Sequence, residues 1–426
     1  MPYCVEWEVI LVSKRLTSLV ILLLCSLLLT GCWSRREIEN LGFATLVALD
    51  RAVDGQIELS AQFAITAAIG EGGMGGSGGG GSEAPVWTVS CKADNLAAAI
   101  EQMRTFIGKY PFWAHTRVII IGEDLARNGI SPILDYFIRS RDFRFSSWMM
   151  VSEGSAKSLL EVVPKLSKLP AELIVELNRV AQETSVSSSR SLLDLLQPLV
   201  EEQAGEPILP LLVTQTATEA PGSGSGVSQG EEVPEQSLEQ NNEAKSLAMV
   251  GFAVFHGDKM IGKLNATDSR ALLWLRGESK RGNLVVEVPG RGYVVQGQIY
   301  ARRTLQVSQV DGKPRAKITI YQDGDLVEHN LNQVELDSAA IKELDGLLKA
   351  HIQTDVEATI QKIQKELQAD VIGIGNRVYR LYPELFNSLN WQEYFPTMPI
   401  ELEVHADFRR TGELLQSPLT KKFPLR

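Results

Sequence analysis

Cys32 is the residue whose type and surroundings point most directly to a chemical reaction. The sequence Leu-Thr-Gly-Cys ends an apolar run that begins after Lys14 and Arg15. Two cations, an apolar run and small residues are the parts of a secretory signal peptide. A cysteine in place of an A-x-A cleavage site forms a lipobox, in which the cysteine sulfur receives a diacylglycerol before cleavage. We therefore predict a lipoprotein signal peptide at 1–31 and a mature chain that starts at a lipidated Cys32.

A transmembrane anchor is the alternative for this stretch. Residues 16–30 would form about 22 Å of helix, whereas a span needs ~20 residues. The Leu-Thr-Gly-Cys ending would also have no role in a span. Acyl chains on Cys32, with a further one such as palmitate, would hold the chain firmly, because each buried CH2 contributes about 0.8 kcal/mol. Glu6 and Glu8 do not suit a signal peptide, so we hypothesise that translation starts near Val12.

Composition excludes some classes of function. The 426 residues carry a net charge of −10, with 44% hydrophobic and 22% charged residues, as in ordinary globular proteins. A mature chain of roughly 395 residues predicts two or three domains. An acidic chain is a poor candidate for nucleic acid, whose phosphates require basic surface. Because cleavage leaves only Cys91 beside the acylated cysteine, we expect no intramolecular disulfide bond.

Residues 32–213 are predicted to form an N-terminal α/β region that could comprise two subdomains. Strand patterns occur within 33–50, 56–69, 84–90, 143–152 and 208–216, and the apolar run 117–122 predicts a strand covered on both faces. Helical spacing occurs at 95–107, 123–139, 155–163, 171–183 and 191–202. In the fourth of these, 171–183, Leu173, Leu177 and Val180 mark the predicted apolar face. The Gly-rich run 70–82 lacks the lysine of a phosphate loop and predicts a flexible loop.

Residues 214–246 are rich in Gly, Ser, Pro and Glu, and they cannot bury enough apolar surface to offset their ordering entropy. We predict a flexible linker here and a domain boundary. A C-terminal domain is expected at 247–413, with a hairpin turn at Gly257, an antiparallel meander and one long helix over 338–370. The apolar stripe of that helix is predicted to pack on its own sheet rather than on a partner. A basic tail, 414–426, ends the chain.

The predicted fold class is therefore α+β: a multidomain chain with mixed or antiparallel sheets, packed helices and a long helix near the C-terminus. The meander is expected to contain five strands, separated by turns that include Asp311-Gly312 and Asp323-Gly324.

Motifs for catalysis and metal binding are missing from the sequence. The five histidines, at 115, 256, 329, 351 and 405, are far apart in the chain. No H-E-x-x-H, cysteine pair, calcium loop or G-x-S-x-G elbow occurs. We expect no enzyme activity, no cofactor and no metal site.

A cluster of four charges is the other candidate site. It consists of Asp135, Arg139, Asp142 and Arg144, around a predicted junction of helix and strand. These residues could form internal ion pairs, each contributing only ~0–1 kcal/mol. Alternatively, some of them contact a partner, because arginine binds carboxylates through a planar fork and is favoured at interfaces. On the second interpretation, Arg144→Ala should leave the fold intact and impair function.

Several stretches together resemble the Ger(x)C family of spore-germination lipoproteins. In the N-terminal half they are LTGCWSRREI at 29–38, His115 ahead of IIIGEDLARNGI at 119–130, and LDYFIRSRDFR at 134–144. In the C-terminal half they are GFAVF at 251–255, IGKL at 261–264, LLWLRG at 272–277 and ADVIGIGNRVYRLYP at 369–383. The resemblance covers nearly the whole mature chain in family order. Ser34 stands where the family usually has Asp.

The resemblance implies a three-domain α+β fold, no established enzymatic activity and the role of C subunit in a nutrient germinant receptor. Such subunits are lipid-anchored on the outer face of the spore inner membrane, beside two integral membrane subunits, A and B. They help to convert nutrient detection into germination. A solute-binding lipoprotein of a transporter is the alternative, and it predicts two similar α/β lobes around a cleft. A lipid-anchored hydrolase is disfavoured by the missing motifs.

Overall fold

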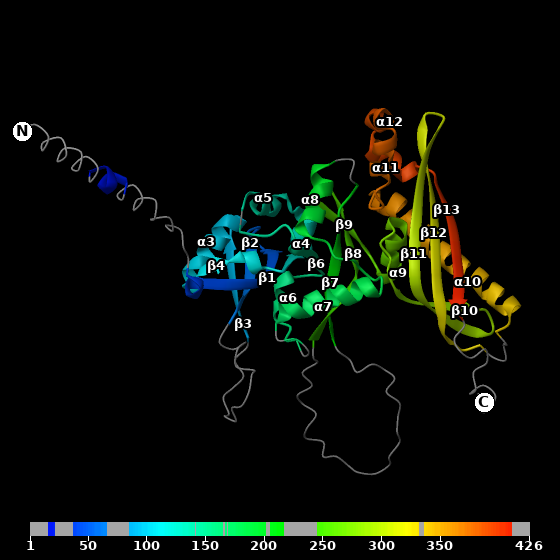
Figure 1. Ribbon diagram of the computed structural model, residues 1–426, viewed down its shortest axis with the longest axis horizontal. Helices are drawn as coiled ribbons and strands as arrows, with labels where there is room; N and C mark the ends of the chain where they lie inside the picture. Colours follow the sequence, from blue (N-terminus) through cyan, green and yellow to red (C-terminus); the bar gives the residue numbers. More distant parts are fainter. Residues whose placement is uncertain are drawn as a thin grey trace, which may run out of the picture. The chain divides into compact units, whose positions relative to one another are not determined.

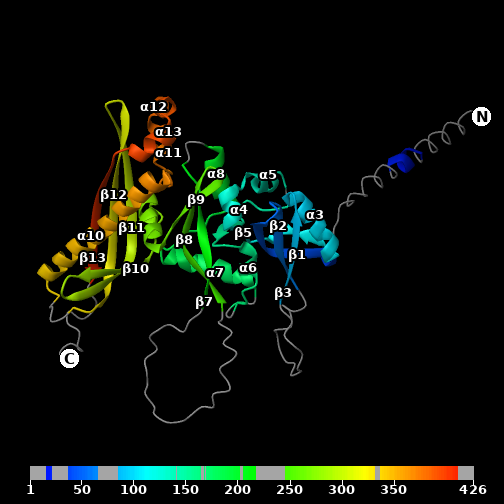
Figure 2. The same ribbon diagram turned by 180° about the vertical axis from the view of Figure 1, so that it is seen from behind.

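The structure, a computed structural model, describes residues 16–21, 37–65, 85–140, 142–164, 167, 169–201, 205–216, 245–331 and 336–410. Figures 1 and 2 show its helices and strands from opposite sides. Cys32, the Gly-rich loop 70–82, most of the linker 214–246 and the tail 414–426 lie outside these residues. Met1–Gly42 forms one unit, which contains the short helix η1 (Ile38–Asn40), and Phe43–Arg426 forms the other.

The first sheet has nine strands, in the order β3-β2-β1-β5-β6-β7-β8-β9, with β4 (Tyr110–Phe112) paired to β1. Four neighbouring strands are parallel: β1 (Leu41–Arg51), β5 (Val118–Gly122), β6 (Trp148–Ser152) and β7 (Ile208–Thr216). Antiparallel strands flank them: β2 (Ile57–Ala64), β3 (Val86–Ala93), β8 (Lys245–His256) and β9 (Lys259–Leu264). All of β5 is buried, which confirms the prediction for 117–122.

Helices cover both faces of this sheet. Alternate residues of β5 belong to different apolar clusters, Ile119 and Ile121 to one and Val118 and Ile120 to the other. The first cluster contains residues of α3 (Leu96–Ile107), α4 (Glu123–Asn128), α5 (Ser131–Arg139) and α8 (Leu192–Val200). The second contains residues of α6 (Ala156–Leu160) and α7 (Pro170–Glu183). The sequence predicted one helix over 123–139, but the structure has two, α4 and α5. They are separated at Gly129, whose φ of 118° does not fit a helix.

The predicted apolar face of α7 was only partly right, because Leu173 and Leu177 pack against the core at its edge and Val180 does not. Val180 is exposed, and Leu173 and Leu177 are only half-buried. The helix instead buries Ala171, Ile174, Asn178 and Ala181. One of these buried residues is a polar asparagine and two are small alanines. The large apolar residues that the prediction relied on lie on the neighbouring side of the helix.

The boundary predicted at 214–246 does not separate two sheets. β7 and β8 pair antiparallel across it, from Ile208↔Val254 to Thr216↔Lys245. β9 continues the hairpin around the turn at Gly257, as predicted. Closing a long loop costs little more entropy than closing a short one, so the linker does not prevent its flanking strands from pairing. Proteolysis within the linker should therefore leave two pieces held together by this ladder.

The second sheet contains β10 (Gly282–Val288), β11 (Gly292–Val310), β12 (Lys313–His329) and β13 (Ile400–Arg410), in that order. The first three strands form the expected antiparallel meander, but with fewer breaks than predicted. Asp323 and Gly324 do not form a turn; they pair with Tyr300 and Gln298 across a bulge inside the β11–β12 ladder. β13 pairs parallel with β12, so the sheet is mixed.

The long helix α10 (Ser338–Gln361) packs on β13 and on α9 (Ala266–Arg276), and a π-helical segment extends it through Leu367. Six residues of its stripe are buried in the C-terminal core: Leu344, Leu348, Ile352, Val356, Ile360 and Ile363. This confirms the predicted packing on its own sheet. Three short helices follow: α11 (Ile374–Leu381), α12 (Pro383–Ser388) and α13 (Trp391–Tyr394).

The mixture of helices with two sheets confirms the predicted α+β class. The two sheets differ in strand number and order. They are therefore not the pair of similar lobes expected for a solute-binding lipoprotein.

Candidate functional site

Two of the four clustered charges form an ion pair on α5. Arg139 Nε donates to both carboxylate oxygens of Asp135, at 2.8 and 2.9 Å. Their i,i+4 spacing places them on the same side of the helix. The Arg139 and Asp135 side chains are 78% and 59% exposed, so the pair contributes only ~0–1 kcal/mol to stability. The opposite side of α5 is buried in the core.

Asp142 and Arg144 follow α5 in a loop that is fixed by the residue between them. The buried ring of Phe143 stacks on Trp113, with 5.3 Å between ring centroids, and meets Phe137 edge-on at 4.7 Å. Asp142 and Arg144 are exposed on either side of it. Within the residues that the structure describes, neither forms an ion pair. The structure thus joins the first two predicted residues to each other but not to the last two.

A pocket of about 370 Å³ lies beside Arg144. Among the described residues, its polar and aromatic lining consists of His115, Thr116, Arg117, Arg144, Ser146, Ser147 and Trp148, and none of these is a carboxylate. The His115 ring packs on two phenylalanines, 5.5 Å from Phe43 and 5.3 Å from Phe112 between centroids. His115 and Arg144 lie in separate stretches of the sequence, and no local pattern places them together.

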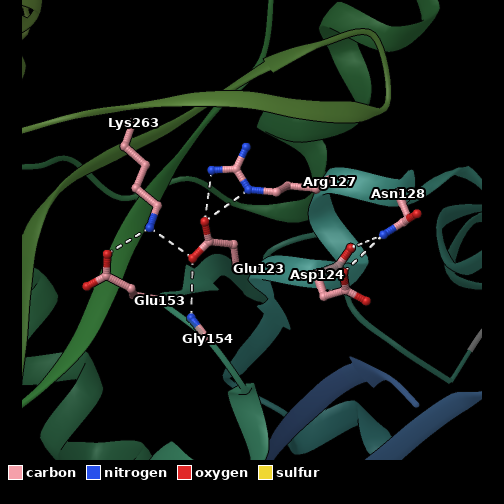
Figure 3. Close-up of polar contacts among 7 residues, drawn as sticks. All are labelled: Glu123, Asp124, Arg127, Asn128, Glu153, Gly154 and Lys263. Atoms are coloured by element: carbon pink, nitrogen blue, oxygen red, sulfur yellow. Dashed lines mark hydrogen bonds and ion pairs between the residues drawn. The ribbon is translucent and has the colours of Figure 1, made fainter. Parts of the chain in front are cut away.

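A second group of charges joins distant parts of the chain (Figure 3). Lys263 Nζ, on β9, lies 2.8 Å from Glu123 Oε2 and 2.7 Å from Glu153 Oε1. Arg127 donates two hydrogen bonds to the other oxygen of Glu123, at 3.0 and 2.8 Å. The Gly154 amide donates a further bond to Glu123 at 3.3 Å. The start of α4, the end of β6 and β9 are thereby fixed to one another.

These contacts keep both partners charged. Burial by itself would raise the pKa of Glu123, but hydrogen bonds from Lys263 and Arg127 outweigh it, and the pKa lies below its ordinary value. Burial would lower the pKa of Lys263, but hydrogen bonds to Glu123 and Glu153 raise it. A group that stays ionised through the neutral range is a poor proton-transfer catalyst. The arrangement is suited to holding elements together.

A third group of charges centres on Glu278, which lies between two arginines. Arg190 Nη2 is 2.6 Å from one carboxylate oxygen and Arg276 Nε is 2.7 Å from the other. Burial would raise the pKa of Glu278, but the two guanidinium groups outweigh burial and lower the pKa to about 2. Arg276 also donates to the Val371 carbonyl at 2.5 Å. Glu278 therefore ties the loop before α8 to the end of α9.

A pocket of about 540 Å³ lies elsewhere in the second unit, lined partly by Glu206, His256 and Asp370. Asp370 is almost fully buried, and burial raises its pKa. The backbone amides of residues 373–375 and the Trp391 indole donate to its carboxylate. Glu206 Oε1 is 2.9 Å from His256 Nδ1. Both carboxylates that line this pocket thus have internal partners.

Sequence reasoning missed the residues that join distant segments. The i,i+4 spacing of Glu123 and Arg127 could have predicted that pair. No local signal connects Lys263 to Glu123 or Arg190 to Glu278, because each pair is far apart in the chain.

Other sequence predictions concern anchors, metals and cysteines. The lipidation site, Cys32, lies outside the described residues. In the part of the chain that is described, no cluster of His, Cys, Asp or Glu could hold a metal ion, and no helix is long and apolar enough to span a bilayer. Cys91 is buried and free.

Comparison with known proteins connects both halves of the chain to one biological process. Residues 34–214 match the domain described as "Spore germination protein N-terminal domain". Residues 250–412 match the domain described as "Spore germination B3/ GerAC like, C-terminal". The two matches leave out most of the linker.

Individual relatives agree over almost the full length. "Putative spore germination protein YfkR" of Bacillus subtilis (strain 168) is 26% identical over 409 residues, covering 95% of this chain and 99% of the relative. "Spore germination protein KC" of the same organism is 24% identical, covering 95% and 97%. A solved structure titled "Crystal Structure of the GerBC protein" has a similar fold, with a TM-score of 0.53 and 17% identity, covering 85% of this chain and 96% of that one.

Proposed function

Since the chain belongs to the GerAC-like, or Ger(x)C, family of spore germination proteins, we propose that it is the lipid-anchored C subunit of a nutrient germinant receptor. The observation that carries the proposal is the match of both family domains, in order, along one chain. In this proposal the chain has no catalytic role. It acts through protein–protein contacts with the integral membrane A and B subunits during nutrient-triggered germination.

Lipid on Cys32 is the proposed membrane anchor. Its support is the Leu-Thr-Gly-Cys sequence at the end of a short apolar run. The chain would then lie on the outer face of the spore inner membrane. Cys32→Ala should abolish incorporation of labelled fatty acid and release the protein from the membrane fraction. Cys25→Ala, in the same apolar run, leaves the lipobox intact and serves as the control. Equal labelling of the two variants would contradict the proposed anchor.

The proposed contact surface for the membrane subunits consists of Asp135, Arg139, Asp142 and Arg144. All four side chains are exposed, on α5 and the loop that follows it. Two apolar side chains beside them, Ile138 and Phe145, are 49% and 47% exposed. Arginine together with exposed apolar groups is a composition that suits a protein–protein interface. Asp135 and Arg139 form an ion pair with each other. Among the described residues, the charges of this surface without an ion-pair partner are therefore those of Asp142 and Arg144 in the loop.

Receptor membership can be tested in spores. A tagged copy of the chain, expressed with its neighbouring membrane subunits, should co-purify with both of them after mild detergent extraction. Deletion of the chain should abolish the response to the nutrient that triggers that receptor. Purification without either membrane subunit, together with a normal nutrient response after deletion, would rule out the proposed role.

A further inference from the structure

The pocket beside Arg144 differs in charge from the rest of this acidic chain. Two arginines and a histidine line it, Arg117, Arg144 and His115, and none of the described residues contributes a carboxylate. The whole chain carries a net charge of −10. A cationic pocket on an acidic protein concentrates positive potential at one place, where it attracts anions.

Both guanidinium groups of the pocket are free to bind. Over the residues that the structure describes, the Arg117 and Arg144 side chains make no hydrogen bond or ion pair with the protein. Three other exposed arginines do have partners: Arg127 pairs with Glu123, Arg139 with Asp135, and Arg179 with Glu176 and Glu183. A guanidinium group has five donors in a planar fork, which matches the oxygens of a phosphate.

The backbone around the pocket is held in place before any ligand arrives. Ser147 Oγ donates to the Thr116 carbonyl at 2.8 Å, and the Trp148 amide donates to the Arg117 carbonyl at 2.8 Å. The Ser147 amide donates to the Arg144 carbonyl at 3.0 Å. These bonds connect the two segments that carry the arginines. A site whose backbone is ordered in advance loses less entropy when it binds.

We infer that Arg117, Arg144 and His115 form a binding site for a phosphate group, carried by an anionic phospholipid headgroup or free in solution. The volume, about 370 Å³, exceeds that of one phosphate and admits a headgroup attached to it. Phe145, 47% exposed and next to Arg144, offers an apolar contact for the lipid. The site binds phosphate whether or not the chain is lipidated.

The inference that a phospholipid headgroup supplies the phosphate rests on the proposed lipid anchor. Phe43, whose ring contacts His115, follows Cys32 by eleven residues, and a chain of that length spans at most roughly 40 Å. An anchored chain therefore carries this pocket within reach of the membrane surface. An anionic bilayer repels an acidic protein, and the cationic pocket supplies a local attraction that offsets the repulsion. Arg144, which also belongs to the proposed contact surface, would then bind lipid at that surface.

The test uses the full-length lipidated chain in a non-ionic detergent and isothermal titration calorimetry. The probes are inorganic phosphate, dihexanoylphosphatidylglycerol and the zwitterionic dihexanoylphosphatidylcholine. We expect saturable binding of the first two, weakened by added salt. Arg117→Gln should reduce the affinity at least about tenfold, because a charge-assisted hydrogen bond contributes ~1.5–3 kcal/mol. Arg117→Gln/Arg144→Gln should abolish binding.

Arg179→Gln is the matched control, because it removes an equal charge from an exposed arginine whose partners are internal. Tighter binding of phosphatidylglycerol than of phosphate identifies the lipid as the source, and equal binding identifies free phosphate. Unchanged affinity in the double variant would overturn the inference. If the double variant also lost the A and B subunits on co-purification, that unchanged affinity would assign these arginines to a protein contact instead. Loss of phosphate binding with normal co-purification would leave the proposed receptor role intact.

Discussion

Arginine occupies two contrasting settings in this molecule. Arg190 and Arg276 hold Glu278 between them at 2.6 and 2.7 Å, and these side chains are mostly shielded from water. Arg117 and Arg144 line an open pocket to which none of the described residues contributes a carboxylate. An ion pair that is shielded from water is costly to break, because the remaining partner is left with an unmatched charge. An unpaired surface charge is nearly neutral for stability. The first setting serves the fold, and the second is available for another molecule.

The largest effect on stability is expected when a charge is placed where water cannot reach it. Ile352→Asp on α10 should lower the free energy of unfolding by about 4 kcal/mol or more, because Ile352 is fully buried in the apolar C-terminal core. Thr354→Asp introduces the same side chain at an exposed position of the same helix and should change stability little. Equal denaturant midpoints for the two variants would show that the α10 stripe is not core.

Breaking the shielded arginine pair should have the next largest effect. Glu278→Gln should cost about 2–3 kcal/mol, less than the ~3–5 kcal/mol of a fully buried pair, because the Glu278 side chain is 30% exposed. Urea denaturation measures the difference. Glu183→Gln, which removes one exposed partner of Arg179, is the control and should cost under about 1 kcal/mol. If the two substitutions cost the same, the contrast between shielded and open arginines fails.

The ion pairs of Glu278 also make the free energy of unfolding depend on pH. The pKa of Glu278 is about 2 in the folded chain, below its ordinary value of 4.5. Because the unfolded chain binds this proton more readily, the contribution of Glu278 is complete above about pH 4.5 and is lost as the pH falls towards 2. The difference in stability between the parent chain and Glu278→Gln should therefore shrink over that interval. A difference that stays constant from pH 6 to pH 2.5 would contradict the lowered pKa.

The smallest effect on stability is expected in the open pocket. Arg144→Ala should change the free energy of unfolding by no more than about 0.5 kcal/mol, since its guanidinium group has no partner among the residues that the structure describes. The nutrient response of spores and the level of the membrane subunits should nevertheless fall. Arg179→Ala provides the control for both measurements. Loss of cooperative unfolding in Arg144→Ala would assign the residue to the fold, and normal germination with normal subunit levels would remove it from the contact surface.

Local sequence signals predicted the elements well wherever one face of an element is apolar throughout. The stripe of α10 and the continuous run of β5 are examples, since their periodicity follows directly from helix and strand geometry. The prediction failed in part for α7, where Asn178 interrupts the buried face. It also failed at Asp323-Gly324, a sequence typical of turns that the long β11–β12 ladder absorbs as a bulge. In both places tertiary contacts outweigh the local preference.

The candidate site was predictable only in part. The spacing of Asp135 and Arg139 gave their ion pair, and a local pattern of charges identified Arg144. The pocket needed His115 and Arg117 from before β5 to meet Arg144 from before β6, and the parallel pairing of those strands brings them together. Nothing in a linear sequence specifies which strands become neighbours in a sheet.

The sequence by itself determined what depends on neighbours along the chain: the candidate lipid attachment at Cys32, the acidic character, most helices and strands, and the family. Only the tertiary structure decided what depends on residues far apart. It paired β7 with β8 across the linker, joined Lys263 to Glu123 and Glu153, placed Glu278 between two arginines and brought Arg117 and Arg144 into one pocket. The physical reason is that charge pairing and burial act through a few ångströms of space, whatever the separation in sequence.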